Sequence, residues 1–200
     1  MFDAVIFDLF GTLIHLPRDT NPYLQLCRVI GNAKRLRESL IVDAPTLTDF
    51  CDYLAVSHPP NLADIQRDLD TDIDNAALFS DSLPALQSLR DRGLRTALIS
   101  NLASPYKRAV ARLELESCFD AILYSCDLGI AKPHPDIYNT ALDRLGATSE
   151  STLMVGDSQR SDVDGPMACG IRGYLIDRDG NSSGNSVLRA LTDITSNLTP

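Results

Sequence analysis

The sequence Ala4-Val5-Ile6-Phe7-Asp8-Leu9-Phe10-Gly11-Thr12-Leu13-Ile14 predicts a strand that delivers a carboxylate to the edge of a sheet. Residues 4–7 form an uninterrupted apolar run, which is typical of a strand buried on both faces of a parallel sheet. Asp8 follows directly, at the end where open α/β sheets collect their ligands. Gly11 permits a sharp backbone turn, and Thr12 offers a hydroxyl and an amide to an anion. A carboxylate in this place is a nucleophile, a metal ligand or both, unless it only caps a turn.

The rest of the chain alternates between strand and helix patterns, which predicts an α/β fold with a parallel sheet and helices on both faces. Short apolar runs typical of strands occupy residues 95–99, 121–124, 152–155 and 173–176. Helical patterns occupy residues 83–92, 105–113, 135–145 and 164–169, and several of them end at a glycine. After Asp179 we expect a flexible loop and one weak helix.

A block of helical patterns lies between the first strand and this alternation. Its helices are expected to begin near Pro22, Ala33, Pro45 and Pro59. Proline early in a helix and glycine at its end follow the usual asymmetry of helix termini. We therefore expect an α/β core formed by residues 1–15 and 79–200. A small all-helical domain of residues 16–78 is expected to be inserted after the first strand.

Composition and charge restrict the possible partners. The chain of 200 residues carries a net charge of −9 and has no basic cluster, which argues against binding to nucleic acid or to anionic membranes. The five cysteines are scattered and never spaced C-x-x-C, which indicates thiols in a reducing compartment. Neither a secretory signal nor an apolar stretch of membrane-spanning length is recognised. We expect a cytoplasmic protein, monomeric or homodimeric, that acts on a small molecule.

Four polar groups are expected at the carboxyl edge of the predicted sheet. Asp8, Ser100-Asn101 and Asp157 follow three of the strands, and Lys132 lies in the loop after a fourth. Two carboxylates, a hydroxyl and a lysine suit phosphoryl transfer through a covalent intermediate. Asp8 would attack, while Ser100 and Lys132 would neutralise the transferring group. A divalent cation between Asp8 and Asp157 would screen the nucleophile from the substrate anion.

Four stretches resemble, in order and spacing, the four motifs of the haloacid dehalogenase (HAD) superfamily. They are FDLFGTL at residues 7–13, ISN at 99–101, AKPHPDIY at 131–138 and VGDSQRSDVDG at 155–165. The resemblance implies a Rossmann-like core. It also places the block of helices where that superfamily inserts its first cap domain, although the residues of the block match nothing recognisable.

The resemblance further implies a role for each matching residue. Asp8 would be the nucleophile, and Mg²⁺ would be held by Asp8, the carbonyl of Phe10 and Asp157. The phosphoryl group would be bound by Thr12, Ser100, Asn101 and Lys132. Asp162 would lie behind these residues and orient metal-bound waters or Lys132. Simpler roles remain open, since Ser100-Asn101 and Asp162 are also good helix caps and Lys132 is also consistent with a solvated surface lysine.

Phe10 departs from the pattern of the superfamily's phosphatases. These usually carry at this position a second Asp, which protonates the leaving alkoxide and later activates water, a contribution worth about 10²–10⁴ in rate. An aromatic residue there resembles instead the 2-haloacid dehalogenases, which need no metal. Asp157 together with Asp162 resembles the metal-holding form, because carboxylates facing Asp8 resist joint ionisation without a cation.

We therefore expect a hydrolase, and foremost a Mg²⁺-dependent phosphatase that acts on a small phosphorylated metabolite through an aspartyl-phosphate. One alternative is a metal-independent 2-haloacid dehalogenase in which Asp8 attacks carbon. The other is a HAD-like module that binds phosphoryl groups with poor turnover. If the protein is a phosphatase, Phe10 predicts a preference for leaving groups that depart as stable anions, such as acyl or aryl phosphates.

Overall fold

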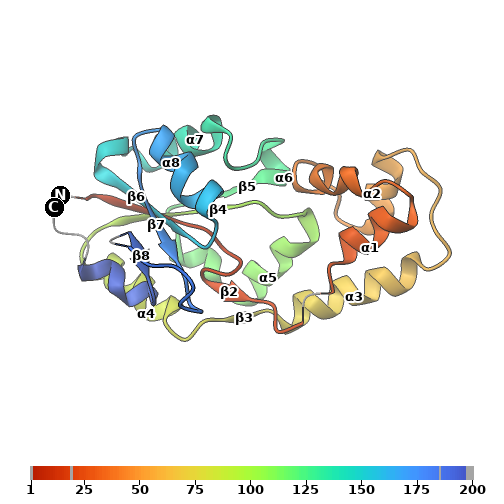
Figure 1. Cartoon of the computed structure of the whole chain (residues 1–200), viewed down its shortest axis with the longest axis horizontal. Helices are drawn as coiled ribbons and strands as arrows, with labels where there is room; N and C mark the ends of the chain where they lie inside the picture. The colour runs from red at the N-terminus through yellow and green to blue at the C-terminus, as the bar shows by residue number, and fades with distance from the viewer. Residues whose placement is uncertain (1, 19, 185, 197–200) are drawn as a thin grey trace.

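The computed structural model describes residues 2–18, 20–184 and 186–196. At its centre is a six-stranded sheet with the strand order β5-β4-β1-β6-β7-β8 (Figure 1). The strands are β1 (Ala4–Phe7), β4 (Arg95–Ser100), β5 (Ala121–Tyr124), β6 (Thr152–Gly156), β7 (Arg172–Ile176) and β8 (Val187–Leu188). All their pairings are parallel, so the predicted Rossmann-like α/β fold is confirmed.

Strand β1 lies inside the sheet because all four of its side chains are apolar and can be buried from both faces. Val5 and Phe7 belong to the apolar cluster on one face, and Ala4 and Ile6 belong to the cluster on the other. This alternation follows from the two-residue period of a strand. The residue after β1, Asp8, therefore emerges from a fully buried strand at the carboxyl edge of the sheet.

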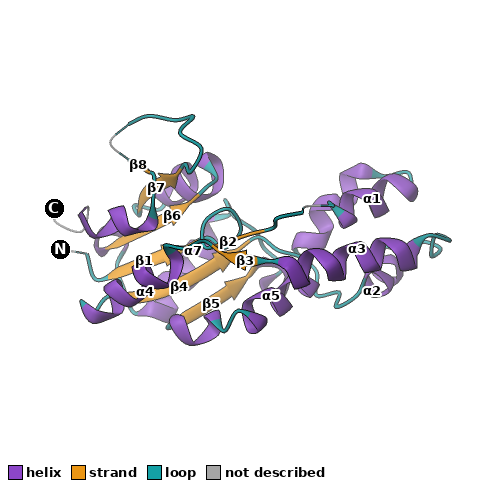
Figure 2. Ribbon diagram, turned by 90° about the horizontal axis from the view of Figure 1, so that it is seen from below, coloured by secondary structure: helices purple, strands orange, loops and turns teal. Residues whose placement is uncertain are grey.

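Helices cover both faces of the sheet (Figure 2). The first apolar cluster includes residues of α4 (Ser82–Asp91), and the second includes residues of α7 (Pro135–Leu145). The other helical elements of this part are η2 (Ser104–Tyr106), α5 (Lys107–Arg112), η3 (Leu115–Cys118), α6 (Ser125–Leu128), η4 (Ser149–Ser151), η5 (Gln159–Asp164), α8 (Gly165–Ala168) and η6 (Leu191–Ser196). The helices predicted at 83–92, 105–113 and 135–145 are confirmed as α4, as η2 with α5, and as α7.

The block of helices after β1 lies beyond one end of the sheet (Figure 1). Its elements are α1 (Pro22–Val29), η1 (Ala33–Leu40), α2 (Leu47–Tyr53) and α3 (Leu62–Asn75). The chain enters and leaves it through a short antiparallel pair, β2 (Ile14–His15) and β3 (Ala77–Leu78). The pair lies at the predicted boundaries of the inserted domain, and the division into two domains stays a prediction.

Several short elements were not predicted from the sequence. Strands β2, β3 and β8 contain two residues each, too few for any hydrophobic period to show. Strand β8 extends the sheet beyond β7 within the tail where only a loop and a weak helix were expected, and the 3-10 helix η6 follows it. The last four residues of the predicted core, 197–200, lie outside the described residues. Among the described helices, none combines the length and the apolarity needed to cross a membrane.

Candidate active site

The ends of three neighbouring strands bring together side chains that are far apart in the sequence. Strand β1 pairs with β4 on one side and with β6 on the other, with Phe7 level with Leu98 and Val155. The amide of Asp8 continues this pairing and donates to the carbonyl of Val155 at 2.9 Å. Asp8, Ser100 at the end of β4 and Asp157 after β6 therefore line one hollow of about 190 Å³. The predicted gathering of these residues at one edge is what the structure shows.

Lys132 is the electrostatic centre of the hollow. Its Nζ lies 2.7 Å from Oδ1 of Asp8 and 2.7 Å from Oδ1 of Asp162, and its side chain is almost completely buried. Burial alone would lower the pKa of the Lys132 ammonium, but Asp8 and Asp162 raise it above its ordinary value. The lysine is therefore protonated at neutral pH, and its ammonium group forms an ion pair with each of the two carboxylates.

Asn101 fixes the loop that carries Lys132. Its side-chain oxygen accepts from the Lys132 amide at 2.8 Å, and its side-chain nitrogen donates to the Lys132 carbonyl at 2.9 Å. Both ends of the Asn101 amide are thus bound to the backbone of one residue, Lys132. This contact gives Asn101 a positioning role in the structure, while its predicted contact with a phosphoryl group stays a prediction.

Asp162 is buried behind Lys132 and is fully hydrogen-bonded. Besides the contact with Lys132, its Oδ2 accepts from the amide of Ser158 at 3.0 Å. The residue belongs to η5, a turn of π-helix that directs this carboxylate back toward β6. The contact with Lys132 is one of the two arrangements that the sequence led us to expect.

Thr12 completes the surroundings of Asp8. Its hydroxyl donates to Oδ2 of Asp8 at 3.3 Å, and its carbonyl accepts from the guanidinium of Arg178 at 2.7 Å. Arg178 also pairs with both oxygens of Asp81 and covers the ring of Phe79. Sequence reasoning did not identify Arg178, which braces the turn after β1 from the far end of the chain.

Three carboxylates converge in the hollow. One oxygen each from Asp8, Asp157 and Asp162 lies within 4.8 Å of the other two. Burial raises the pKa of Asp8 to about 7 against the opposing effect of Lys132, and Asp162 and Asp157 add to the rise. Burial and Asp162 also raise the pKa of Asp157 above its ordinary value. The carboxyls of this cluster therefore resist joint ionisation beside Lys132 when no further cation is bound.

Two glycines make room for these carboxylates. A Cβ on Gly11 would lie 2.1 Å from Oδ2 of Asp157, and one on Gly156 would lie 2.3 Å from the carboxyl group of Asp162. Gly11 also has a φ of +77°, which only glycine adopts readily. The sequence indicated that Gly11 turns the chain, and the structure adds that it leaves space for Asp157.

Phe10 faces the hollow from the turn between β1 and β2. Its ring packs edge-to-face on Tyr106 with 5.4 Å between the ring centres. Leu9 provides the carbonyl that closes this turn, accepting from the amides of Thr12, Leu13 and Ile14, whereas no backbone amide in the described residues donates to the Phe10 carbonyl. That carbonyl is thus available to a ligand, and its role in holding a metal stays a prediction, while the side chain has no proton to give.

Two further residues that were not identified from the sequence line the hollow. Ser158 and Ser161 line it together with the predicted residues. Both belong to the stretch 155–165, so the motif indicated their neighbourhood but not their orientation. The Ser158 hydroxyl accepts from the Ser161 amide, which caps η5.

Comparison with known proteins decides the family. A model of haloacid dehalogenase-like hydrolases matches residues 2–170. The chain belongs to the haloacid dehalogenase-like hydrolase family. The family membership inferred from the four motifs is therefore confirmed, while the catalytic roles of the individual residues stay predictions.

Two relatives and one solved structure show the degree of sequence and structural similarity between this chain and other proteins. The chain is 35% identical over 111 residues to haloacid dehalogenase-like hydrolase domain-containing protein 3 of Danio rerio, covering 55% of this chain and 46% of that protein. It is 26% identical over 195 residues to glyceraldehyde 3-phosphate phosphatase of Pyrococcus abyssi, covering 86% and 80%. A HAD phosphatase structure from Thermococcus onnurineus superposes with a TM-score of 0.71 at 22% identity, covering 99% and 98%.

These matches have clear limits. The chain spans about half the length of the curated relatives it matches at 31–35% identity. Solved structures of dehalogenases share the same fold at 19–22% identity. The fold of this HAD-like hydrolase is therefore common to both chemistries, and the choice between them must come from the side chains in the hollow.

Proposed function

We propose that the protein is a Mg²⁺-dependent phosphatase that acts on a small phosphorylated molecule through an aspartyl-phosphate at Asp8. One observation carries the proposal: buried Lys132 lies between Asp8 and Asp162, while Asp157 brings a third carboxylate to within 4.8 Å. When all three carboxylates are ionised, they exceed the charge of the Lys132 ammonium by two. A divalent cation would balance this excess.

The chemistry of the donor set supports Mg²⁺ rather than a softer metal. Carboxylate and carbonyl oxygens are the ligands that Mg²⁺ prefers, and Asp8, Asp157 and the Phe10 carbonyl would supply them. When bound, the cation would polarise the phosphoryl group and offset the charge of the attacking carboxylate. Among the described residues, the lining of the hollow includes neither histidine nor cysteine, the usual ligands of softer metals.

The remaining residues would divide the work of phosphoryl transfer. Asp8 would attack phosphorus and form the acyl phosphate as the bond from phosphorus to the leaving oxygen breaks, and water would then hydrolyse the acyl phosphate, releasing phosphate and restoring Asp8. Lys132 would neutralise charge on the phosphoryl oxygens, and the hydroxyls of Thr12 and Ser100 would donate to them. Asn101 and Asp162 would hold Lys132 in place, one through its backbone and the other through its ammonium group.

We further propose that residues 16–78 act as the cap of this enzyme. The chain crosses to these helices only through β2 and β3 and the loops beside them, and a second cavity lies between the helices and the sheet edge. Closure of such a cap would exclude bulk water while the phosphoryl group is transferred to Asp8. The cytoplasm stays the proposed location, and monomer or homodimer the proposed assembly.

Removal of divalent metal is expected to lower the hydrolysis of para-nitrophenyl phosphate by at least about 10²-fold. The reason is that the three carboxylates then repel the incoming phosphoryl group. Activity should return with added Mg²⁺ and not with Na⁺ at equal ionic strength. Full activity in excess EDTA would contradict the metal-dependent mechanism.

Phe10 favours one second candidate, a 2-haloacid dehalogenase. A halide leaves without a proton, so an apolar residue at position 10 costs that reaction nothing. The same samples should therefore be given 2-chloropropionate with and without Mg²⁺. Halide release that survives EDTA, without phosphate release from any ester, would replace the phosphatase proposal with this one.

Phe10 also predicts how phosphatase activity depends on the leaving group. Because no acid is available at position 10 to protonate the departing oxygen, kcat/KM should fall steeply as the leaving-group pKa rises. Between para-nitrophenyl phosphate and an alkyl phosphate of similar size we expect a loss of at least about 10²-fold. Phe10→Asp should flatten this dependence. A flat dependence in the unaltered protein would show that another group donates the proton.

A further inference from the structure

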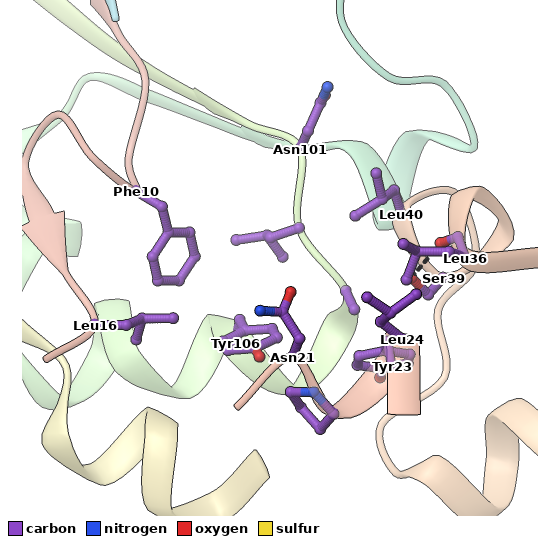
Figure 3. Close-up of a pocket in the computed structure, with 13 residues that line it drawn as sticks. Phe10, Leu16, Asn21, Tyr23, Leu24, Leu36, Ser39, Leu40, Asn101 and Tyr106 are labelled. Carbon is purple, nitrogen blue, oxygen red and sulfur yellow. Dashed lines mark hydrogen bonds between the residues drawn. The ribbon is translucent and has the colours of Figure 1, made fainter. Parts of the chain in front are cut away.

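A second cavity adjoins the hollow that holds Asp8. Its volume is about 250 Å³, and it lies between η2 with its preceding loop on one side and α1 with η1 on the other (Figure 3). Phe10 and Asn101 line both spaces. A group leaving from a phosphoryl centre at Asp8 can therefore enter the second cavity across the ring of Phe10.

The lining of this cavity is uncharged. None of its 13 lining residues, all within the described part of the chain, is an Asp, Glu, Lys, Arg or His. Hydrocarbon side chains form most of the wall, and Leu24, Leu36 and Leu40 face Phe10 from the helices (Figure 3). A charged group placed here would lose its hydration without gaining a partner, which is costly.

Most polar atoms in the lining already have partners. The Ser39 hydroxyl donates to the Leu36 carbonyl at 2.7 Å, and the Asn101 amide is bound to Lys132 at both ends. The hydroxyl of Tyr23 is different, because it has no hydrogen-bond partner in the described residues. The residue is 95% buried, so bulk water does not satisfy this hydroxyl either. A buried hydroxyl without a partner carries a free-energy cost that a ligand atom would remove.

We propose that this cavity binds the leaving group of the substrate, and that this group is uncharged, largely apolar and carries one hydrogen-bonding atom for Tyr23. The proposal rests on the phosphatase function proposed above and names its substrate class, a phosphate monoester of a neutral, phenol-like alcohol. A cavity of about 150 Å³ lined by aliphatic and aromatic residues is known to hold one benzene ring, so about 250 Å³ accommodates a substituted ring. Sugar, amino-acid and carboxylate-bearing phosphates fit this lining poorly.

Two esters with matched leaving groups separate this effect from that of Phe10. They are para-ethylphenyl phosphate and para-(carboxymethyl)phenyl phosphate, whose phenols have similar pKa values and similar size. With Mg²⁺ present, kcat/KM should be at least about tenfold higher for the neutral ester. Equal kcat/KM values for the two esters would overturn the inference and leave the phosphatase function standing.

A charge introduced into the cavity should change this preference. Leu24 lines the cavity from α1, and Leu24→Lys is expected to reduce the ratio of the two kcat/KM values at least about tenfold by attracting the carboxylate. Leu83→Lys is the matched control, since Leu83 is an exposed leucine on α4 outside both spaces, and it should leave the ratio unchanged. Leu40→Lys repeats the test from η1 if Leu24→Lys does not fold. An unchanged ratio in a folded cavity variant would contradict the proposal.

The Tyr23 hydroxyl is tested by its own substitution. Tyr23→Phe should lower kcat/KM for para-acetylphenyl phosphate, which carries an acceptor, relative to para-ethylphenyl phosphate, which carries none. We expect a relative loss of about five- to tenfold, in the range of one hydrogen bond between neutral groups. Equal changes for both esters would show that the hydroxyl does not contact the leaving group.

Failure of the proposed function gives a different result from failure of this inference. If neither ester is hydrolysed with Mg²⁺, the phosphatase proposal fails, and calorimetric titration with the two corresponding arylphosphonates then tests the cavity. Tighter binding of the neutral phosphonate, lost in Leu24→Lys and kept in Leu83→Lys, supports the cavity assignment. Equal binding of both phosphonates, or binding of neither, overturns it.

Discussion

Asp8→Asn is expected to lower kcat/KM for para-nitrophenyl phosphate by at least about 10⁴-fold. The substitution keeps the size of the side chain and its place beside Lys132, but an amide oxygen is a poor nucleophile toward phosphorus. Initial rates with purified protein and Mg²⁺ measure the effect. Because Asp8 is buried against a cation, the thermal unfolding of the variant should be recorded beside its activity.

Asp3→Asn is the matched control for this experiment. Asp3 precedes the same strand and is exposed, and within the described residues its backbone groups alone form hydrogen bonds, to Ser151 and Arg95. Its activity should equal that of the unaltered protein. If Asp8→Asn retained activity comparable to Asp3→Asn, Asp8 would not be the nucleophile and the proposed mechanism would have to be abandoned.

Lys132→Met has the second largest expected effect, on both activity and stability. The substitution leaves the carboxylates of Asp8 and Asp162 buried beside each other without their shared cation. Breaking such a buried arrangement typically costs about 3–5 kcal/mol of unfolding free energy. Loss of the charged donor should also lower kcat by about 10²–10³-fold. Denaturant unfolding in EDTA and steady-state kinetics in Mg²⁺ measure the two effects.

Lys107→Met provides the comparison, because Lys107 also bridges two aspartates, Asp43 and Asp127, but at the surface. Its loss should cost no more than about 1 kcal/mol. The loss of unfolding free energy in Lys132→Met, relative to the unaltered protein, should become smaller as the pH falls from 8 to 5 in EDTA. The sign follows from the pKa of Asp8, which burial raises to about 7, so that the carboxyl becomes neutral and needs no cation at the lower pH. If Lys132→Met lost no more unfolding free energy than Lys107→Met at pH 8, the buried contacts of Lys132 would contribute little to stability.

The sequence predicted the framework of the site because a parallel sheet imposes it. Asp8 and Asp157 each follow an apolar run, and parallel neighbouring strands must end at the same edge, so their proximity required no knowledge of packing. Five of the six strands followed in the same way from the alternation of periods, whereas β8, with two residues, did not.

The contacts that arrange the site were beyond sequence reasoning because they depend on tertiary packing. Nothing in the local pattern shows that Asn101 holds the backbone of Lys132, that Gly11 leaves space for Asp157, or that Arg178 braces Thr12. The uncharged cavity was likewise hidden, since its walls come from α1, η1 and the loop after β4, and only the fold brings them together. Charged residues of the inserted helices such as Arg28 and Arg35 do not line this cavity.

The central claim is that a side-chain oxygen of Asp8 becomes bonded to phosphorus. The most direct test is to quench the enzyme with acid during turnover of an aryl phosphate that is radiolabelled at phosphorus, with Mg²⁺ present. One part of the quenched protein is counted for label, and another is reduced with borohydride and analysed by peptide mass spectrometry. The account predicts acid-stable label on the protein before reduction, and conversion of Asp8 to homoserine in the peptide that begins the chain. Rapid turnover with no label on the protein and an unaltered Asp8 would contradict it.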